Sequence, residues 1–289
     1  MESLSNQYVP RAIELELAGA VLDLSGRVLV MGILNRTPDS FYDKGRYFEL
    51  GDAIARAEQM IEEGADIIDV GGQKAGPGEP VSPAEEIDRV CPVIRHISRS
   101  GGAWVSVDTF VAEVAREAVG AGAHMINDIS GLSDPDMGCV VAETGASIVL
   151  THIKGKPRVP NPDPQYEDLL SEVEENLLDR ARQLESLGVS RRRIILDAGL
   201  DLGKSTSQSL ALLKHTGRLC SLGYPVMLSA SNKRFIGDSL GLPVDGRLFA
   251  SIAAAVYAVA AGARIVRVHN VAETVQAVRL VEQILAAEP

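Results

Sequence analysis

The segment GADIIDVGG, residues 64–72, contains the unit from which the fold can be predicted. Gly64 suits the left-handed conformation that ends a helix, and Ala65 keeps the following turn tight. The β-branched residues after them are typical of a buried strand, which closes near Asp69 and Gly71. The same Gly-Ala pair precedes three more apolar runs, at residues 122–123, 145–146 and 262–263. The chain therefore repeats one arrangement of helix, glycine turn and short strand.

Eight strands are predicted along the chain, and amphipathic stretches that predict helices lie between them. The strands are expected at residues 27–34, 66–71, 104–108, 124–129, 147–152, 193–197, 225–229 and 264–269. The helices include residues 52–63, 112–120, 166–187 and 272–287, and a Pro-rich stretch, 156–164, is expected to form a long loop. Strands that are apolar along most of their length and alternate with helices indicate a parallel sheet covered by helices.

The number of units favours a closed barrel. Eight units in 289 residues average about 36 residues each, typical of an α/β fold of the (β/α)₈ (TIM) barrel type. We predict one barrel domain, residues 27–289, after an N-terminal extension, residues 1–26. The alternative is a doubly wound open sheet, which often has a Gly-rich turn after its first strand. Here that strand runs into Asn35-Arg36-Thr37-Pro38 instead.

Composition limits the partners and the compartment. The chain has 28 Lys and Arg against 39 Asp and Glu, a net charge of −11, and it has no basic run, so we expect neither nucleic acid nor a membrane as a partner. The apolar stretch 248–263 is shorter than the roughly 20 residues of a membrane span, so we expect a helix buried in the core or in a subunit interface. The three cysteines are widely spaced, which predicts buried thiols in a reducing cytoplasm.

Polar residues close almost every predicted strand. They are Asn35, Asp69, Asp108, Asn127, Asp128, His152, Asp197, Ser229, Lys233, Arg267 and His269. In a (β/α)₈ barrel the carboxyl ends of the strands meet at one mouth, where active sites are built. Any one of these residues could be a turn former, but so many together predict a buried polar ligand.

The kinds of side chain indicate two parts of that ligand. Carboxylate, amide and ammonium groups at Asp108, Asn127, Asp197 and Lys233 match a flat heterocycle with several N–H donors. Arg267 and His269 are two positions apart and point to the same side of their strand, which suits an anion. A salt bridge at the barrel rim is the alternative for that pair.

The ordered motifs resemble the dihydropteroate synthase family across nearly the whole chain. The matching segments are MGILNRTPDSF (31–41), GADIIDVGG (64–72), SVDT (106–109), INDISG (126–131), residues 197–204, SNKRFIG (231–237) and RVH (267–269). The resemblance implies a (β/α)₈ barrel that joins 6-hydroxymethyl-dihydropterin pyrophosphate to p-aminobenzoate and releases pyrophosphate.

The resemblance also implies residue roles. Asp108, Asn127, Asp197 and Lys233 would hold the pterin, with Asp197 and Lys233 as the catalytic residues. The pyrophosphate would be held by Asn35, Arg267 and His269, with Mg²⁺ bound at Asn35. The reaction needs no side-chain nucleophile, because the pterin ring stabilises a cation at the carbon that pyrophosphate leaves.

The sequence departs from the family in its loops. Where the family reads GGESTRPG, this chain has GGQKAGPG at residues 71–78, so that Gln73, Lys74, Ala75 and Gly76 replace Glu, Ser, Thr and Arg. Further departures are Arg36, Lys44, Asp201, Leu202 and Asn232. Leu202 stands where an aromatic ring would pack on p-aminobenzoate, whereas Arg36 and Lys44 could restore positive charge.

These departures predict a synthase homologue that binds a pterin but condenses it with p-aminobenzoate weakly or not at all. One alternative is a fully active dihydropteroate synthase, and another is a non-catalytic pterin-binding or interaction protein. A corrinoid-partnered folate methyltransferase is disfavoured, because it needs no pyrophosphate clamp. We also expect a homodimer, which the Ala-rich stretch 248–263 and the resemblance both favour.

Overall fold

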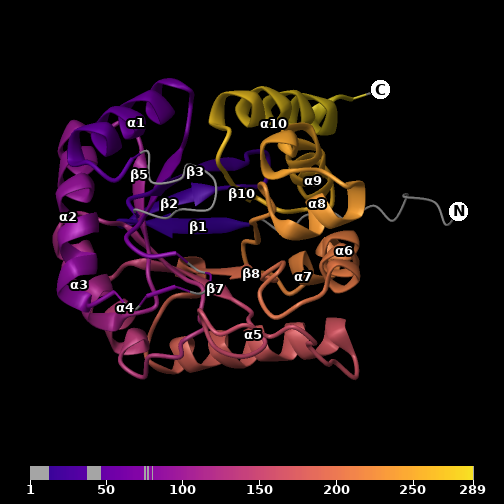
Figure 1. Cartoon of the computed structure of the whole chain (residues 1–289), viewed down its shortest axis with the longest axis horizontal. Coiled ribbons are helices and arrows are strands. Elements are labelled where there is room, and N and C mark those ends of the chain that lie inside the picture. The colour runs from indigo at the N-terminus through magenta and orange to yellow at the C-terminus, as the bar shows by residue number, and fades with distance from the viewer. Residues whose placement is uncertain (1–12, 38–46, 75, 77, 80, 289) are drawn as a thin grey trace, which may run out of the picture.

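Eight parallel strands form a nearly closed barrel in the computed structural model, which describes residues 13–37, 47–74, 76, 78–79 and 81–288. The strands lie in the order β8-β7-β6-β5-β4-β3-β10-β9. A parallel bridge between Leu196 and Val226 links the last strand to the first. Helices surround this ring (Figure 1). The predicted (β/α)₈ barrel is confirmed, and the open sheet is excluded.

The barrel strands are β3 (Leu29–Asn35), β4 (Ile67–Gly71), β5 (Trp104–Asp108), β6 (Met125–Asp128), β7 (Ser147–Thr151), β8 (Ile194–Asp197), β9 (Met227–Leu228) and β10 (Ile265–Val268). The α-helices are α1 (Leu50–Glu62), α2 (Pro83–Ser100), α3 (Ala112–Gly120), α4 (Met137–Thr144), α5 (Leu169–Ser186), α6 (Thr206–Lys214), α7 (Thr216–Cys220), α8 (Arg234–Leu240), α9 (Leu248–Ala260) and α10 (Val271–Ala286). Each predicted strand overlaps one of these, although β9 is shorter than expected.

The glycine turns behave as the sequence predicts. Gly64, Gly122, Gly145 and Gly262 have φ angles of 95°, 114°, 75° and 113°. A side chain is strained in this left-handed region, so glycine ends each helix at low cost and turns the chain into the next strand.

The inside of the barrel is apolar near the amino ends of the strands and polar near their carboxyl ends. The apolar layer consists of Leu29, Met31, Ile67, Met125, Val149, Ile195, Met227 and Ile265, with Trp104 packed against it. Side chains two positions further along a strand point to the same side. That step places Asp69, Asn127, Thr151, Asp197, Ser229 and Arg267 in a polar layer above the apolar one.

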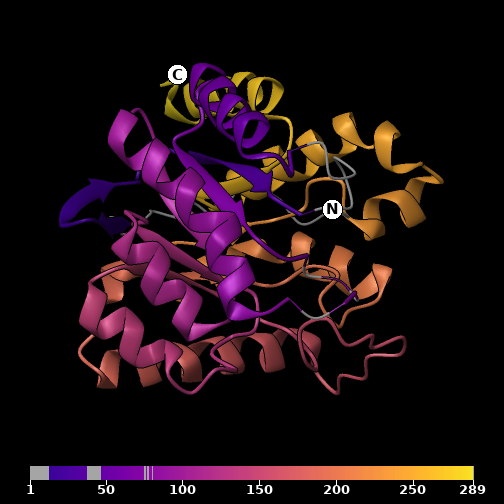
Figure 2. The ribbon, with the colours of Figure 1, turned by 60° about the vertical axis from the view of Figure 1, so that its left-hand side comes forward.

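A hairpin closes the apolar end of the barrel. Its strands, β1 (Glu14–Leu17) and β2 (Ala20–Asp23), pair antiparallel (Figure 2). Leu15 and Leu17 are buried and join the apolar layer of the interior. The hairpin thus removes the open end of the barrel from solvent, which leaves the opposite, polar end as the mouth. The sequence analysis predicted no strand among residues 1–26.

Helix α9 is buried on one face only. Ala254, Ala255 and Ala258 lie in the core, whereas Phe249 is 81% exposed and Tyr257 is 47% exposed. No helix in the described part of the chain is both long and apolar enough to span a membrane. The prediction of three buried thiols was wrong for Cys139, which lies on the exposed side of α4, while Cys91 and Cys220 are buried.

Candidate active site

Arg267 lies at the centre of the polar layer, between two carboxylates. Its Nε donates to Asp69 Oδ2 at 2.6 Å, and its Nη2 donates to Asp108 Oδ2 at 2.7 Å. Asn127 Nδ2 donates to the same oxygen of Asp69 at 2.9 Å. Four strands, β4, β5, β6 and β10, are therefore linked by one network at the mouth. Arg267 thus forms the ion pairs that were the alternative to anion binding.

Burial sets the charges in this network. It raises the pKa of Asp108 to about 7, an effect that Arg267 opposes and Asp69 reinforces. Burial also lowers the pKa of Arg267, but Asp69 and Asp108 outweigh it, so the net shift is upward and the guanidinium stays charged. Within the described residues, Asp69 Oδ1 and Asn127 Oδ1 are buried acceptors without a hydrogen-bond partner. Such acceptors favour a ligand rich in N–H donors.

Asp197 and Lys233 face the network from the other side of the mouth. Asp197 is 2% exposed, and its Oδ1 accepts from the backbone N–H of Gly199 at 2.7 Å. Burial raises the pKa of Asp197, and the nearby Lys233 opposes that shift. Lys233 Nζ donates to the carbonyl of Leu200 at 2.8 Å, and burial lowers its pKa against the pull of Asp197. The four residues predicted to hold a heterocycle therefore meet at one mouth.

The residues predicted to hold an anion border the same space. His269 lies beside Arg267 on β10, and its Nδ1 is 3.0 Å from Ser231 Oγ. Burial, reinforced by the charge of Arg267, lowers the pKa of His269 to about 3, so the imidazole is neutral at neutral pH. It can donate one hydrogen bond but adds no positive charge, so Arg267 supplies the only charge of this pair.

Asn35 lies across Gly71 from Asp108. A Cβ atom on Gly71 would be 3.1 Å from Asn35 Oδ1 and 3.6 Å from Asp108 Cβ, so the glycine lets these side chains approach. In the described residues no group of three or more His, Cys, Asp or Glu side chains could hold a metal ion. Mg²⁺ is often bound by one or two protein oxygens together with substrate phosphates, and the Asn35 amide oxygen fits that kind of site.

Lys204 fastens two loops at the mouth and was missed as a site residue. Its side chain is buried, and Nζ donates to the carbonyls of His152, Gly199 and Leu202 at 2.9–3.0 Å and contacts His152 Nδ1 at 2.9 Å. A Cβ on Gly199 would clash with the carbonyl of His152, so the loops after β7 and β8 pack backbone to backbone. This packing fixes the turn that follows Asp197.

Arg36, one of the substituted residues of the rim, turns away from the mouth. Arg36 donates to the carbonyls of Phe48, Asp88 and Arg89 at 2.8–3.1 Å. Its charge is therefore directed to the start of α1 and to α2, not to the mouth. Lys44 and Ala75 lie outside the described residues.

Asn232 shows why an asparagine fits where the family has an arginine. It is buried, and its φ of 57° is in the left-handed region, which asparagine adopts more readily than most residues. Its Oδ1 accepts from Ser251 Oγ of α9 at 3.4 Å. The short side chain therefore packs under the mouth and places no charge in it.

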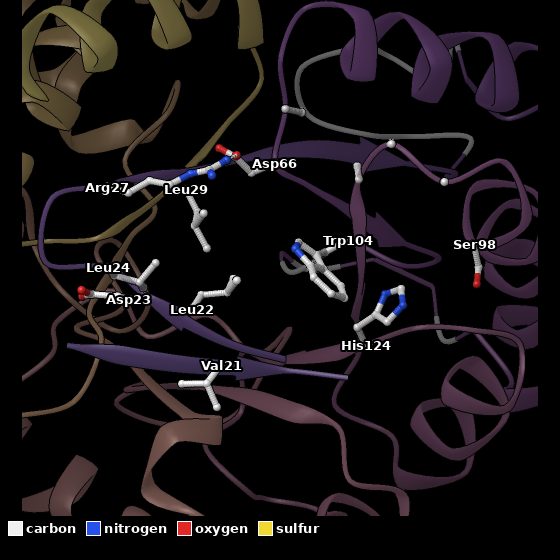
Figure 3. Close-up of a pocket in the computed structure, with 14 residues that line it drawn as sticks. Val21, Leu22, Asp23, Leu24, Arg27, Leu29, Asp66, Ser98, Trp104 and His124 are labelled. Carbon is white, nitrogen blue, oxygen red and sulfur yellow. Dashed lines mark hydrogen bonds and ion pairs between the residues drawn. The ribbon is translucent and has the colours of Figure 1, made fainter. Parts of the chain in front are cut away.

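A separate cavity lies at the apolar end of the barrel. It has a volume of about 600 Å³ and lies beside the β1–β2 hairpin and the end of α2 (Figure 3). Trp104 meets His124 edge to face there, with ring centroids 5.0 Å apart. This cavity contains none of the predicted site residues.

Asp69 and Ser231 are the other site residues that the sequence analysis left without a role. Asp69 carries a detectable signal, because an acid inside a β-branched run needs a buried partner. Its partner, Arg267, lies 198 residues further along the chain, and nothing local identifies it. Ser231 has no comparable signal, since its contact with His269 depends on the path of the loop after β9.

Comparison with known proteins agrees with this geometry. Residues 31–269 match the family model described as pterin binding enzyme. The dihydropteroate synthase of Escherichia coli (strain K12) is 42% identical over 271 residues, which are 93% of this chain and 96% of that protein. The chain belongs to the dihydropteroate synthase family. A crystal structure of Yersinia pestis dihydropteroate synthase with a sulfonamide drug complex matches with a TM-score of 0.91 and 39% identity, covering 96% of this chain and 100% of that one.

The dihydropteroate synthase family includes relatives of two kinds. The inactive dihydropteroate synthase 2 of Mycobacterium leprae (strain TN) is also 42% identical, over 269 residues that are 91% of this chain and 92% of that protein. The identity equals that of the Escherichia coli enzyme. The predicted family is therefore confirmed, whereas overall identity does not separate active from inactive relatives.

Proposed function

We propose that this chain binds a pterin of the 6-hydroxymethyl-7,8-dihydropterin pyrophosphate type at the mouth. The observation that carries the proposal is the convergence of Asp108, Asn127, Asp197 and Lys233 around Arg267. Carboxylates accept from the ring N–H and amino groups, Asn127 both donates and accepts, and Lys233 donates to a ring nitrogen or carbonyl. Asp197 and Lys233 are the residues we expect to act closest to the reacting carbon.

The diphosphate binds on the β3 and β10 side in this proposal. Arg267 pairs through Nε and Nη2, and Nη1 has two more N–H donors for a phosphate oxygen. His269 donates as a neutral imidazole. Asn35 holds Mg²⁺, which when bound neutralises charge on the departing diphosphate.

We infer that condensation with p-aminobenzoate is weak or lost. The pterin ring can stabilise the cation left by pyrophosphate, so the protein supplies position and charge stabilisation. Both depend on the rim, where the substituted Arg36 and Asn232 point elsewhere and Leu202 offers no aromatic surface. One misplaced donor can cost about 2.7–4 kcal/mol of transition-state stabilisation.

Two measurements on the same preparation test this proposal. Calorimetric titration with 6-hydroxymethylpterin should show saturable binding that Asp197→Asn weakens. A steady-state assay with the pterin pyrophosphate, p-aminobenzoate and Mg²⁺ should show turnover far below the usual enzyme range, which begins near about 1 s⁻¹. A turnover near that value would refute the loss of condensation, whereas failure to bind the pterin would refute the site.

A fully active synthase is the second candidate, and a specific observation favours it. The network of Asp69, Asp108, Asn127 and Arg267 is complete, and Lys204 holds the turn after Asp197 in place. Growth of a synthase-deficient strain that expresses this chain would support the active enzyme. Failure to grow despite good expression would count against it.

We also propose a homodimer that pairs through α9 and α10. Phe249 and Tyr257 on α9 and Leu280 and Ile284 on α10 are all between 47% and 81% exposed. The two helices pack against each other, so these side chains can form one apolar surface (Figure 1). Light scattering should give the mass of a dimer, and Phe249→Glu should give a monomer that keeps its circular dichroism. A wild-type monomer at micromolar concentration would contradict this.

A further inference from the structure

Arg158 belongs to the loop after β7, but its guanidinium lies on the loop after β4. Its Nη1 donates to Gln73 Oε1 at 2.7 Å, and its Nη2 donates to the carbonyl of Glu79. Strands β5 and β6 separate β7 from β4 in the barrel, so this side chain bridges two rim loops that are not neighbours. Arg158 itself has a φ of 64°, which few residues with a side chain adopt.

Gln73 holds Arg158 through an amide whose two ends have different partners. Its Nε2 donates to Glu86 Oε2 at 2.6 Å, while its Oε1 accepts from Arg158. The amide therefore lies between a buried carboxyl group and a guanidinium, with each end facing the group it can bond. Since Gln73 is neutral, it positions Arg158 without cancelling its charge.

The hydrogen-bond partners of Arg158 do not neutralise its charge, and the acid that it influences, Glu86, bonds to Gln73 instead. Both acceptors are neutral, and among the described residues Arg158 forms no ion pair. Lys74 lies beside it, because a Cβ on Gly78 would be 3.1 Å from Lys74 Nζ and 3.2 Å from Arg158 Nη2. Two cations thus converge on a glycine in a chain whose net charge is −11. An anion between them would relieve their repulsion.

This cation pair borders the candidate active site. Glu86, which bonds to Gln73, lies close enough to Thr109, the residue after Asp108, for Thr109 to lower its pKa. Its charge contributes to the raised pKa of Asp108. Gln73 and Glu86 therefore connect Arg158 to the neighbourhood of Asp108 in the proposed pterin site.

We propose that Arg158 and Lys74 form an oxyanion-binding site on the rim of the mouth, which rests on the proposed pterin function. Two of the five guanidinium N–H donors are used by Gln73 and Glu79, and the others remain for a carboxylate or a phosphate. Because the diphosphate is proposed to bind on the β3 and β10 side, the anionic group expected here is the carboxylate of the acceptor, and a phosphate is the alternative that the test distinguishes. The site provides affinity for that group on the side of the mouth opposite β10.

The test measures binding of three probes by calorimetry: 4-aminobenzoate, its neutral analogue 4-aminobenzamide, and inorganic pyrophosphate. The variants are Arg158→Gln, Arg158→Lys and Gln73→Glu, which would pair a carboxylate with Arg158. The matched control is Arg182→Gln, which removes the same charge from an exposed position on α5. Titration with 6-hydroxymethylpterin reports the pterin site separately.

Arg158→Gln and Gln73→Glu should each weaken binding of either 4-aminobenzoate or pyrophosphate about tenfold. A loss of this size is the usual effect of losing a charge-assisted hydrogen bond. Arg158→Lys should recover part of the loss, while 4-aminobenzamide and the control should change less than twofold. A loss confined to 4-aminobenzoate identifies the carboxylate, and a loss confined to pyrophosphate identifies the phosphate. Equal affinities in wild type and both variants, or no anion binding by the wild type, would overturn the site.

The outcome of the pterin titration keeps the two proposals distinct. If the wild type binds an oxyanion through Arg158 but no pterin, the proposed function fails and the rim site stands. If it binds pterin and the Arg158 variants bind both anions normally, the rim site fails and the pterin site stands.

Discussion

The strand ends and the rim loops of the mouth differ in how their polar groups are used. At the strand ends, Arg267, Asp69 and Asp108 face one another in a layer fixed by eight strands. On the rim, Arg36 and Asn232 bond to groups outside the mouth, and Arg158 is held by neutral partners. In the proposed function, pterin recognition therefore depends on the strand ends, while the departures from the family lie on the rim, where a second substrate would be received.

The largest effect is expected at the strand ends. Arg267→Met should lower the free energy of unfolding by about 3–5 kcal/mol, because two buried carboxylates lose their partner. The Arg267→Met variant should also lose pterin binding. Urea denaturation measures the first effect and calorimetry the second.

Arg27→Met is the matched control, since Arg27 pairs with Asp66 but is 61% exposed. Arg27→Met should lower the free energy of unfolding by about 1 kcal/mol or less. Equal losses in the two variants would mean that the network at the strand ends is no more important than a surface pair.

A smaller change separates recognition from stability at the same layer. Asp197→Asn should weaken pterin binding about 10- to 100-fold, because it removes a charged acceptor from a buried site. Stability should not fall, since burial already disfavours the charge of Asp197. Asp179→Asn, on the exposed side of α5, should leave the affinity unchanged. If Asp197→Asn keeps the pterin affinity of the wild type, Asp197 does not bind the pterin.

Glu86 links the two regions and should make stability depend on pH. Burial raises its pKa from 4.5 to about 7, although Thr109, Gln73, Arg89 and Arg158 oppose the shift. The folded state therefore binds more protons than the unfolded state between about pH 4.5 and 7, so Glu86 makes stability fall as pH rises through that window.

Glu86→Gln removes this dependence. Relative to the wild type, the variant should gain about 1–2 kcal/mol of unfolding free energy between pH 4.5 and pH 8. Urea denaturation at the two pH values measures the gain. A constant difference between the two proteins would show that folding does not shift the pKa of Glu86.

The smallest effect is expected on the rim. Leu202→Phe should leave the pterin affinity within about twofold and improve binding of 4-aminobenzoate about threefold, because a ring gives the acceptor an aromatic surface. Leu210→Phe, at a 43% exposed position on α6, is the control. A large change in pterin affinity would show that the rim and the strand ends are not separate in function.

Much of the fold follows from local patterns in the sequence. The Gly-Ala turns and the β-branched runs predict every barrel strand, and the period of two along a strand predicts that Arg267 and His269 share a side with the ligand. The hairpin was missed although ELEL at residues 14–17 alternates in the manner of a strand. The apolar residues of that stretch are buried only because the hairpin covers one end of the barrel. No local pattern in the sequence predicts that contact.

The candidate site was predicted in its parts and not in its connections. Strand ends indicated Asp108, Asn127 and Asp197, and the last two predicted strands indicated Lys233, shortly after a strand, and Arg267, within one. The pairing of Arg267 with Asp69, and that of Arg158 with Gln73, join segments 198 and 85 residues apart. Such pairs depend on how the barrel closes and on the path of long loops. Neither the closure of the barrel nor the path of a long loop can be predicted from the sequence alone with the accuracy that a hydrogen bond requires.

A crystal structure with bound 6-hydroxymethylpterin tests the central claim most directly. The account predicts the ring in the mouth, with its N–H and amino groups bonded to Asp108, Asn127 and Asp197 and with Lys233 donating to it. A ring bound elsewhere, or a mouth left empty at saturating pterin, would contradict it.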